Sequence, residues 1–344
     1  MDQEYTQRLK NIEAHLDRWL PENPDAAWLR DVFPGTENIS ALSIKSLLEP
    51  GKDMISRGGK RWRPLLMTLV CESLGGGDAA LPLAPLVEFC HNASLIHDDI
   101  EDDSDERRGK PAVHHIYGVD TAINSGAFFY FLPLCCIESC AAENKGQIYR
   151  LWAECMRRLH LGQAMDISWH RDISFVPAIE EYYVMCGLKT GGLSRFAAEL
   201  GAFSAGAPQE SARRLGDAAE KLGIGFQILD DVKNLTTGIP GKKRGDDVVE
   251  GKKSLPVLLF LHKRPQERER IFSCFQAAKA GGVSVPETEE LIQTLTDSGV
   301  LAEAEENGHS LIQEAREIFN SQCAGFPINE KSRVLLDGLI GLIS

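Results

Sequence analysis

Apolar residues recur at helical spacing along nearly the whole chain of 344 residues. Segments such as LWAECMRRLHLGQAM and VLLDGLIGLI place them three and four positions apart, which predicts one buried face on each helix. No long stretch shows the strict alternation that a half-buried strand requires. The sequence therefore predicts an all-α fold. Because no low-complexity linker divides the chain, we expect one domain over residues 1–344.

Clusters of glycine and proline predict where the helices end. They lie at residues 50–51, 57–59, 75–77, 109–111, 206–208 and 238–251. The last cluster belongs to a long loop, TTGIPGKKRGDDVVEGKK, which lies between two helical segments and is too long for a simple connection. Such loops are often lids or binding loops.

A dense acidic stretch follows one of the apolar helices. In HDDIEDDSDERRGKP, seven of the nine residues from Asp98 to Glu106 are carboxylates, and three of the next four are cations. Blocks of like charge are usually solvated, but the preceding run LVEFCHNASLI must be packed inside the protein. The sequence therefore predicts a buried helix that carries carboxylates into a site.

A second segment repeats this arrangement. SLIHDDIED and FQILDDVKN each place two aspartates at the end of an apolar helix. Positions i and i+4 share a helix face, so Asp98 and Asp102 project together beside Asp99, and Asp230 projects with Asn234. A single acidic pair of this kind is usually a solvent-facing helix end. Two such faces predict Mg²⁺, which prefers oxygen ligands and commonly binds substrate phosphates as well.

Several cations lie where a phosphate could use them. Lys60 and Arg63 follow two glycines at the expected start of a helix, and Arg107 and Arg108 follow the acidic stretch. The two later arginines can either pair with the aspartates or clamp a diphosphate, and their position favours the clamp. Further candidates in the second half of the chain are Lys189, Thr190, Lys242, Lys243 and Lys252.

Composition narrows the classes of function. A net charge of −13 argues against nucleic-acid binding, which needs a basic face. The longest apolar run, AFFYFLPLCCI, is shorter than the ~20 residues of a membrane helix, and no secretion signal is visible at the start. We therefore expect a water-soluble, cytoplasmic protein without an integral membrane segment.

The cysteines point in the same direction. Nine cysteines are scattered along the chain without a CxxC pair, which favours reduced thiols. Cys136 and Cys140 form only a CxxxC, and we interpret them as small core residues rather than metal ligands.

Taken in order, GGKRWRP, LIHDDIEDDSDERRGKP, GQAMD, LKTGGL, FQILDDVKN and GKKRGDDVVEGKKSLP resemble the trans-isoprenyl diphosphate synthase, or polyprenyl synthetase, family. The resemblance runs from about residue 56 to residue 260. It implies an all-helical bundle around a deep central cavity, usually in a homodimer, with both aspartate motifs at the cavity mouth. It also implies Mg²⁺-dependent joining of isopentenyl diphosphate to an allylic diphosphate, with a geranylgeranyl diphosphate synthase as the most similar type.

The resemblance assigns roles to individual residues. Asp98, Asp102 and Asp230 would hold the Mg²⁺ ions, with Asp99 and Asp231 in support. The residues that match contacts to the allylic substrate are Arg107, Lys189, Thr190, Gln227, Lys242 and Lys252. Those that match contacts to isopentenyl diphosphate are Lys60, Arg63, His91 and Arg108. Carbonyl dipoles near Lys189 and Thr190 and the amide oxygen of Gln227 would stabilise the carbocation, and released diphosphate would take the proton.

Two features depart from the family pattern. Asn234 stands where a third aspartate is usual, so weaker metal binding is expected, although an amide oxygen can still bind a cation or its water. The loop carries both Lys242 and Lys243, and spacing does not decide between them. Two rival functions remain: a class I terpene cyclase, which would not need the isopentenyl diphosphate contacts, and a non-catalytic subunit of a heteromeric synthase.

Small residues below the first motif suggest a long product. Ala93, Ser94 and Cys90 lie on the face that leads down the helix from Asp98, so we expect elongation beyond farnesyl diphosphate. Phe128 or Phe129 of the next helix could end the cavity near geranylgeranyl length. Both could equally be ordinary core aromatics, in which case Phe89 is the next candidate and a longer product is expected.

Overall fold

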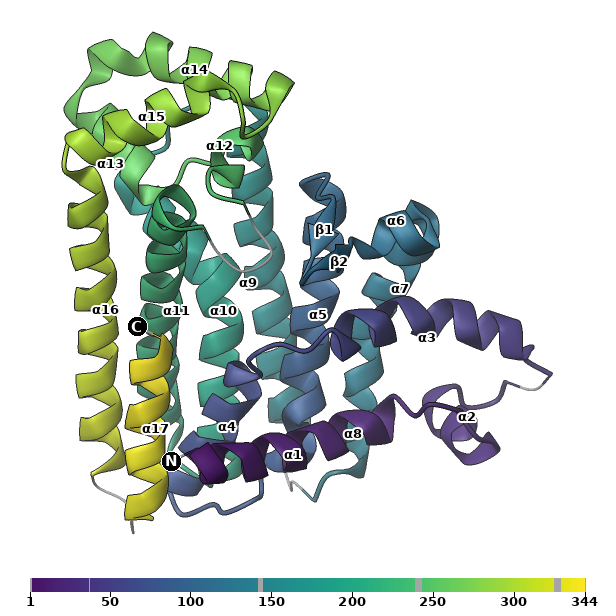
Figure 1. Cartoon of the computed structure of the whole chain (residues 1–344). Coiled ribbons are helices and arrows are strands. Elements are labelled where there is room, and N and C mark those ends of the chain that lie inside the picture. Colours follow the sequence, from purple (N-terminus) through teal and green to yellow (C-terminus); the bar gives the residue numbers. More distant parts are fainter. Residues whose placement is uncertain (1, 37, 142–144, 239–242, 325–328, 344) are drawn as a thin grey trace. The chain divides into compact units, whose positions relative to one another are not determined.

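Helices make up most of the computed structural model, which describes residues 2–36, 38–141, 145–238, 243–324 and 329–343. Within these ranges, strands are limited to one antiparallel pair, β1 (Glu106–Arg107) and β2 (Lys110–Pro111), with Arg107 opposite Lys110. Figure 1 shows the helices and this small hairpin. The predicted all-α fold is confirmed.

The helices of the first half of the chain are α1 (Asp2–Trp19), α2 (Ala26–Val32), α3 (Ala41–Ser56), α4 (Trp62–Ser73), η1 (Leu81–Leu83), α5 (Ala84–Glu101), α6 (Val113–Tyr117), α7 (Val119–Phe131), η2 (Leu132–Leu134), α8 (Cys135–Ser139) and α9 (Lys145–Arg171). Those of the second half are α10 (Ile179–Ser204), α11 (Gln209–Thr236), α12 (Asp246–Glu250), α13 (Leu255–Lys263), η3 (Pro265–Glu267), α14 (Arg268–Gly281), α15 (Pro286–Asp297), α16 (Val300–Cys323) and α17 (Glu330–Ile343).

The chain divides into two compact units. The first unit consists of Met1–Glu154, Phe196–Gly216 and Asn320–Leu339. The second unit consists of Cys155–Arg195, Asp217–Phe319 and Ile340–Ser344. The first aspartate motif therefore lies in the first unit and the second motif in the second unit. The expectation of one domain over the whole chain stays a prediction.

The core of the first unit joins α3, α5, α6 and α7 through a cluster of Met54, Ile96, Val113 and Ala122. Helix α3 runs through Pro50 and Gly51, so the break predicted there is wrong. A Cβ atom at position 51 would lie only 2.1 Å from the ring of Phe129 in α7. The glycine thus permits close packing of α3 on α7, which outweighs the hydrogen bond lost at the proline.

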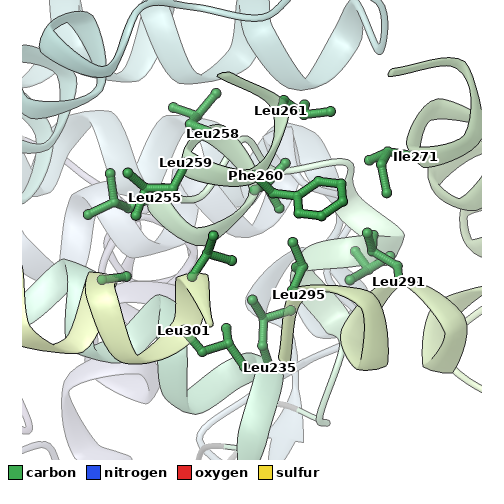
Figure 2. Close-up of a cluster of buried hydrophobic side chains, with 14 of the residues drawn as sticks. Leu235, Leu255, Leu258, Leu259, Phe260, Leu261, Ile271, Leu291, Leu295 and Leu301 are labelled. Carbon is green, nitrogen blue, oxygen red and sulfur yellow. The ribbon is translucent and has the colours of Figure 1, made fainter. Parts of the chain in front are cut away.

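The core of the second unit surrounds α13. Its residues Leu255–Leu261 are all buried, and they pack with side chains of α11, α14, α15 and α16 (Figure 2). A helix that is apolar on all sides is typical of the interior of a large protein. Each fully buried side chain of this kind contributes about 1.5–3 kcal/mol through the hydrophobic effect. This cluster therefore anchors the segment that follows the long loop.

The break predicted over residues 238–251 contains one further helix, α12. Gly245 and Gly251 flank it with φ angles of 87° and 76°, in the left-handed region that glycine adopts readily. Five residues are too few to show a helical period in the sequence, so the prediction of an irregular loop was wrong for this part. The other predicted breaks near residues 57–59, 75–77 and 206–208 coincide with helix ends.

One stretch of the described chain, Val119–Ser139, is long and apolar enough to cross a membrane. It covers α7, η2 and α8, and half of its most apolar window is buried inside the protein. Helices that lie in the core of a water-soluble protein pass the same test. Length and composition are therefore weak evidence for a membrane span.

All nine cysteines are free, as the prediction of reduced thiols requires. Cys136 is fully buried and Cys140 is partly buried. Burial raises the pKa of Cys90 to about 12 and that of Cys71 to about 11, so both remain protonated at neutral pH.

Candidate functional site

The first aspartate motif lies at the C-terminal end of α5. The helix ends at Glu101, and the backbone N–H of Asp102 donates to the carbonyl of Asp98 at 2.9 Å. Asp98 and Asp102 therefore lie one helical turn apart, as predicted. Asp98 is half-buried and Asp99 is fully buried. The end of a helix dipole is already negative there, so these carboxylates need nearby cations.

Arg107 of β1 supplies one of those cations. Its Nε donates to Asp99 Oδ1 at 2.7 Å, its Nη2 contacts the same oxygen, and Nη2 lies 3.7 Å from Asp98 Oδ2. Burial nevertheless raises the pKa of Asp99 above its ordinary value, because the Arg107 charge offsets only part of the desolvation. Of the two roles considered for this arginine, the structure shows the ion pair with the motif.

Arg108 is held by oxygen atoms of neighbouring helices. Its Nη1 donates to the carbonyl of Met54 at 3.1 Å, to the carbonyl of Gly58 and to Asn92 Oδ1 at 3.3 Å. Its φ angle of 54° lies in the left-handed region, which few residues other than glycine adopt. Burial lowers the pKa of Arg108 from its ordinary value, but arginine remains charged at any physiological pH.

A buried ion pair lies beside these arginines. Arg61 donates to Glu88 at 2.8 Å, to Glu13 at 2.8 Å and to the carbonyl of Ile55 at 2.7 Å. Glu88 also accepts a hydrogen bond from Asn92 at 2.7 Å. Burial raises the pKa of Glu88, and Arg61 acts against that rise. Arg61 thus has two carboxylate partners as well as a backbone carbonyl, which stabilises the charge of a buried arginine.

The other residues matched to isopentenyl diphosphate lie close by in the same unit. Lys60 is exposed, Arg63 is buried with its guanidinium 4.4 Å from the Trp62 ring centroid, and His91 is half-buried. Burial lowers the pKa of His91 well below its ordinary value, and nearby arginines, Arg63 first among them, lower it further. His91 is therefore neutral at pH 7 and lies within a field of positive charge that suits an anion.

The second aspartate motif lies near the end of α11 and is supported by neutral side chains. Asp231 accepts hydrogen bonds from Gln227 Nε2 at 2.8 Å and from the Tyr182 hydroxyl at 2.7 Å. Gln227 Oε1 in turn accepts a hydrogen bond from Thr190 at 2.8 Å. Asp230 is half-buried, whereas Asp231 is 5% exposed. These hydrogen bonds, from Thr190 to Gln227 and from Gln227 and Tyr182 to Asp231, therefore orient the Asp231 carboxylate.

The pKa of Asp231 is raised to about 7, from 3.8. Burial is the main cause, and the carboxylate of Asp247 raises the pKa further. The two hydrogen bonds to Asp231 act in the opposite direction but do not cancel the desolvation. Burial in the folded protein thus favours the protonated form of Asp231.

Asn234 connects α11 to the short helix α12. Its side chain is fully buried, and its Oδ1 accepts a hydrogen bond from the backbone N–H of Asp247 at 3.3 Å. Its backbone carbonyl accepts another from the N–H of Gly245 at 3.0 Å. Asn234 thus helps to hold α12 against α11. Its amide oxygen has a second lone pair, so the expectation that it binds a cation or its water stays a prediction.

The lysines matched to the allylic substrate pair with carboxylates of their own unit. Lys189 Nζ donates to Asp166 Oδ2 at 2.6 Å. Lys252 Nζ pairs with Glu250 and lies 3.7 Å from Asp247 Oδ1. Both lysine side chains are about one-fifth exposed, at 21% and 18%, so each can still reach solvent.

The choice between Lys242 and Lys243 is not decided by the structure. Lys242 lies outside the described residues. Lys243 is exposed, and its backbone N–H donates to Asp246 at 2.6 Å, at the start of α12.

The small residues below the first motif face different surroundings. Ala93 and Cys90 are fully buried, and the Cys90 thiol contacts the carbonyl of Tyr130 at 3.9 Å. Ser94 is half-buried, and its hydroxyl donates to the carbonyl of His91 at 2.8 Å. Of the three, Ser94 is thus the one that is partly exposed.

The two candidate phenylalanines also differ. Phe129 is fully buried, with its ring 5.6 Å from that of Phe89 and directly over Gly51. Phe128 is half-buried and stacks on Phe33 at 5.6 Å with an interplanar angle of 17°. Phe129 therefore packs as a core aromatic, and Phe128 is the better candidate for a wall that a ligand could reach.

Comparison with known proteins identifies the family. Residues 44–292 match the model of the polyprenyl synthetase family. The chain belongs to the polyprenyl synthetase family. It is 34% identical over 315 residues to a geranylgeranyl diphosphate synthase of Methanosarcina mazei, a match that covers 90% of this chain and 89% of that protein.

Two further relatives agree. A geranylfarnesyl diphosphate synthase of Aeropyrum pernix is 32% identical over 304 residues, covering 84% of this chain and 91% of the relative. The crystal structure of a geranylgeranyl pyrophosphate synthetase from Pyrococcus horikoshii superposes with a TM-score of 0.81 at 27% identity, over 99% of this chain and 96% of that one. This polyprenyl synthetase is therefore an enzyme, a prenyltransferase.

Sequence reasoning missed several residues that support the site of this polyprenyl synthetase. They are Arg57, Arg61, Glu88, Asn92, Asp166 and Tyr182. Arg61 and Asp166 lie inside the motifs GGKRWRP and GQAMD, so their position was a usable signal. Tyr182 lies seven residues, two helical turns, before Lys189 on α10, but nothing in the sequence connects it to Asp231.

The donor atoms fit a hard divalent cation. In the first unit, Asp98 and Asp102 carry carboxylate oxygens, and Asp99 Oδ2 is buried without a hydrogen bond. In the second unit, Asp230 carries a further carboxylate. In the described part of the chain, no three or more histidine, cysteine or acidic side chains lie close enough together to hold a metal ion by themselves. Proteins commonly bind Mg²⁺ through one or two carboxylates, while water and substrate phosphates complete the coordination.

Proposed function

We propose that this polyprenyl synthetase joins isopentenyl diphosphate to an allylic diphosphate in a Mg²⁺-dependent reaction and makes an all-trans product, mainly geranylgeranyl diphosphate. The observation that carries the proposal is the end of α5. There, Asp98 and Asp99 lie beside Arg107, and His91 lies in the field of four arginines. Carboxylates that suit a metal and cations that suit phosphate thus lie on one helix end.

The proposed roles divide the cations between two substrates. Lys60, Arg63, His91 and Arg108 bind the diphosphate of isopentenyl diphosphate, with neutral His91 donating a hydrogen bond. Arg107, Lys189, Lys242 and Lys252 bind the diphosphate of the allylic substrate. Asp98, Asp102 and Asp230 would hold Mg²⁺, and Asp99 and Asp231 support them. When bound, the metal neutralises the negative charge that develops on the leaving diphosphate.

The residues of the chain have three tasks in the reaction. The cations bind the leaving diphosphate while the allylic C–O bond breaks, and the electron pair leaves with the diphosphate. Backbone carbonyl dipoles near Lys189 and Thr190 and the amide oxygen of Gln227 stabilise the allylic cation, and the Thr190 hydroxyl orients that amide. The double bond of isopentenyl diphosphate then attacks this cation, forming the new C–C bond. Loss of a proton to the released diphosphate restores a double bond.

The length of the product follows from the face of α5 below Asp98. Ser94 is small and only half-buried, which supports elongation beyond farnesyl diphosphate, and Phe128 is the proposed end of the cavity. Relatives named as geranylgeranyl and geranylfarnesyl diphosphate synthases support a product in this range. Farnesyl diphosphate and longer polyprenyl diphosphates remain the alternative products. We also propose that the enzyme is a cytoplasmic homodimer.

Product analysis tests this proposal. The purified protein would be incubated with isopentenyl diphosphate and, separately, with dimethylallyl, geranyl or farnesyl diphosphate, in Mg²⁺ or in a metal chelator. We expect linear geranylgeranyl diphosphate in Mg²⁺ and no product in the chelator. A cyclised hydrocarbon would indicate a terpene cyclase. No turnover with any starter would indicate a non-catalytic subunit, and either result would overturn the proposal.

Two substitutions test the chain-length residues. Ser94→Phe should shorten the main product toward farnesyl diphosphate, because the ring fills the space below Asp98. Phe128→Ala should lengthen it. Phe129→Ala serves as the matched control, since this ring packs in the core: it should lower the melting temperature without lengthening the product. An unchanged product from both Ser94→Phe and Phe128→Ala would show that the end of the cavity lies elsewhere.

A further inference from the structure

Arg57 at the end of α3 contacts both strands of the hairpin. Its Nη1 donates to the carbonyl of Arg107 on β1 at 3.2 Å and to the carbonyl of Pro111 on β2 at 2.9 Å. Its Nη2 pairs with the carboxylate of Asp53, one turn earlier on α3. The Arg57 side chain is 0% exposed. The guanidinium thus contacts two backbone carbonyls and the Asp53 carboxylate, and it is not exposed to solvent.

The hairpin needs such support from outside. Each strand has only two residues, and an isolated two-stranded hairpin is marginally stable in water. Its turn places Arg108 at φ 54° and Gly109 at φ 75°. A non-glycine residue in the left-handed region persists only where surrounding contacts hold it. The conformation of the β1–β2 hairpin is therefore set largely by contacts with the rest of the protein.

The support runs in both directions. Arg108 donates to the carbonyls of Met54 and Gly58 at the end of α3, while Arg57 donates to carbonyls of the hairpin. The last carbonyls of a helix have no partner within the helix, and Arg108 supplies one for the carbonyl of Met54. The carbonyl of Gly58 accepts from Arg108 and also from Arg61, at 3.2 Å. Two arginines thus cross between the end of α3 and the hairpin.

We propose that Arg57 is a positioning residue that holds the hairpin so that Arg107 and Arg108 present their guanidinium groups for diphosphate binding. The inference rests on the proposed function, since it concerns how two of its cations are oriented. Asp53 acts with Arg57, because its carboxylate fixes the guanidinium and its Oδ1 also lies 3.7 Å from Lys110 of β2. Arg57 itself does not touch substrate, because it is fully buried.

The test combines hydrogen exchange with kinetics on Arg57→Lys, Arg57→Met and Asp53→Asn. Lysine keeps the charge but cannot donate to two carbonyls and a carboxylate in the fork geometry of arginine. We expect faster backbone amide exchange in residues 105–112 without a matching change in residues 255–263. We also expect the KM for isopentenyl diphosphate to rise about tenfold, equivalent to one lost charged hydrogen bond, with a smaller change in kcat.

Arg214→Lys is the matched control. Arg214 belongs to the same unit and forms an i,i+4 pair with Glu210 at 2.8 Å, but it is exposed and far along the chain from the hairpin. This variant should match the wild type in exchange and in KM. Asp53→Asn keeps the test valid if Arg57→Met fails to fold, because it removes only the fixing carboxylate.

Two outcomes would overturn the inference. One is unchanged exchange in residues 105–112 for folded Arg57→Lys and Asp53→Asn. The other is a fall in kcat in the Arg57 and Asp53 variants while the KM for isopentenyl diphosphate stays unchanged, which would indicate a general loss of active protein. Absence of prenyl transfer in the wild type is a different result: it would remove the proposed function, while the exchange measurement would still decide whether Arg57 holds the hairpin.

Discussion

The two aspartate motifs of this polyprenyl synthetase carry similar sequences but have different supports. In the first motif, buried Asp99 pairs with the charged Arg107. In the second motif, buried Asp231 is held by the neutral side chains of Gln227 and Tyr182. A carboxylate with a cation beside it keeps its charge at less cost than one with neutral donors only. The same pair of letters, DD, therefore describes two electrostatic environments.

The largest expected effect concerns the carboxylates that face outward from the first motif. Asp98→Ala or Asp102→Ala should lower turnover by about a thousandfold or more, because each removes charge stabilisation of the leaving diphosphate. Circular dichroism should remain that of the wild type. Asp105→Ala, at a side chain that is 99% exposed, is the control and should retain activity. Near-normal turnover of both motif variants at saturating Mg²⁺ would remove these residues from the metal site.

The next largest effect is expected from removing the ion pair between Asp99 and Arg107. Asp99→Asn leaves the buried guanidinium of Arg107 without its main anion, so the free energy of unfolding should fall by about 2–4 kcal/mol. Urea unfolding in a chelator measures this loss. The double variant with Arg107→Met should recover part of it, because the uncompensated charge is then gone. Equal stability of Asp99→Asn and the wild type would show that the ion pair contributes nothing.

Asp231→Asn should instead become more stable relative to the wild type as the pH rises. Its pKa in the folded protein is about 7, above the ordinary 3.8, so the folded state favours the protonated form. The stability that this group contributes is fully present below about pH 4 and is lost as the pH rises through 7. Asp231→Asn lacks this titration. In a chelator, the free energy of unfolding of the variant should therefore rise relative to that of the wild type by about 1–3 kcal/mol between pH 5 and pH 8.

Thermal unfolding across that pH range provides the measurement for Asp231. The Asp99→Asn variant should show a smaller gain with rising pH, because the Arg107 charge offsets part of the burial that raises the pKa of Asp99. A stability difference between wild type and Asp231→Asn that stays constant from pH 5 to pH 8 would contradict the raised pKa.

The smallest effect separates the metal residues within the second motif. Asp230→Asn should raise the Mg²⁺ concentration at half-maximal binding about tenfold, as loss of one charged ligand predicts. Asn234→Asp should change it by less than about twofold, because this side chain is buried and bonded to Asp247. Titration calorimetry with Mg²⁺ and inorganic diphosphate measures both. A clear tightening by Asn234→Asp would return position 234 to the metal site.

Much of the site could be predicted from the sequence because its chemistry is local. Asp98 and Asp102 lie one turn apart in any helix, and the cations of GGKRWRP and ERRGK follow in fixed order along the chain. What could not be predicted were partners from distant segments. Tyr182 lies 49 residues before Asp231, and Asn92 lies 16 residues before Arg108. No periodicity or spacing connects such pairs.

The sequence by itself determined the all-α fold, most helix ends and the family, since helical periods, glycine clusters and motif order are properties of neighbouring residues. Only the tertiary structure decided which buried aspartate has a cation, that α3 continues through Pro50 and Gly51, and that Asn234 holds α12. Each of these depends on packing between segments far apart in the chain. Burial and the charges brought together by folding determine a pKa, and neither can be read from the residue's own sequence.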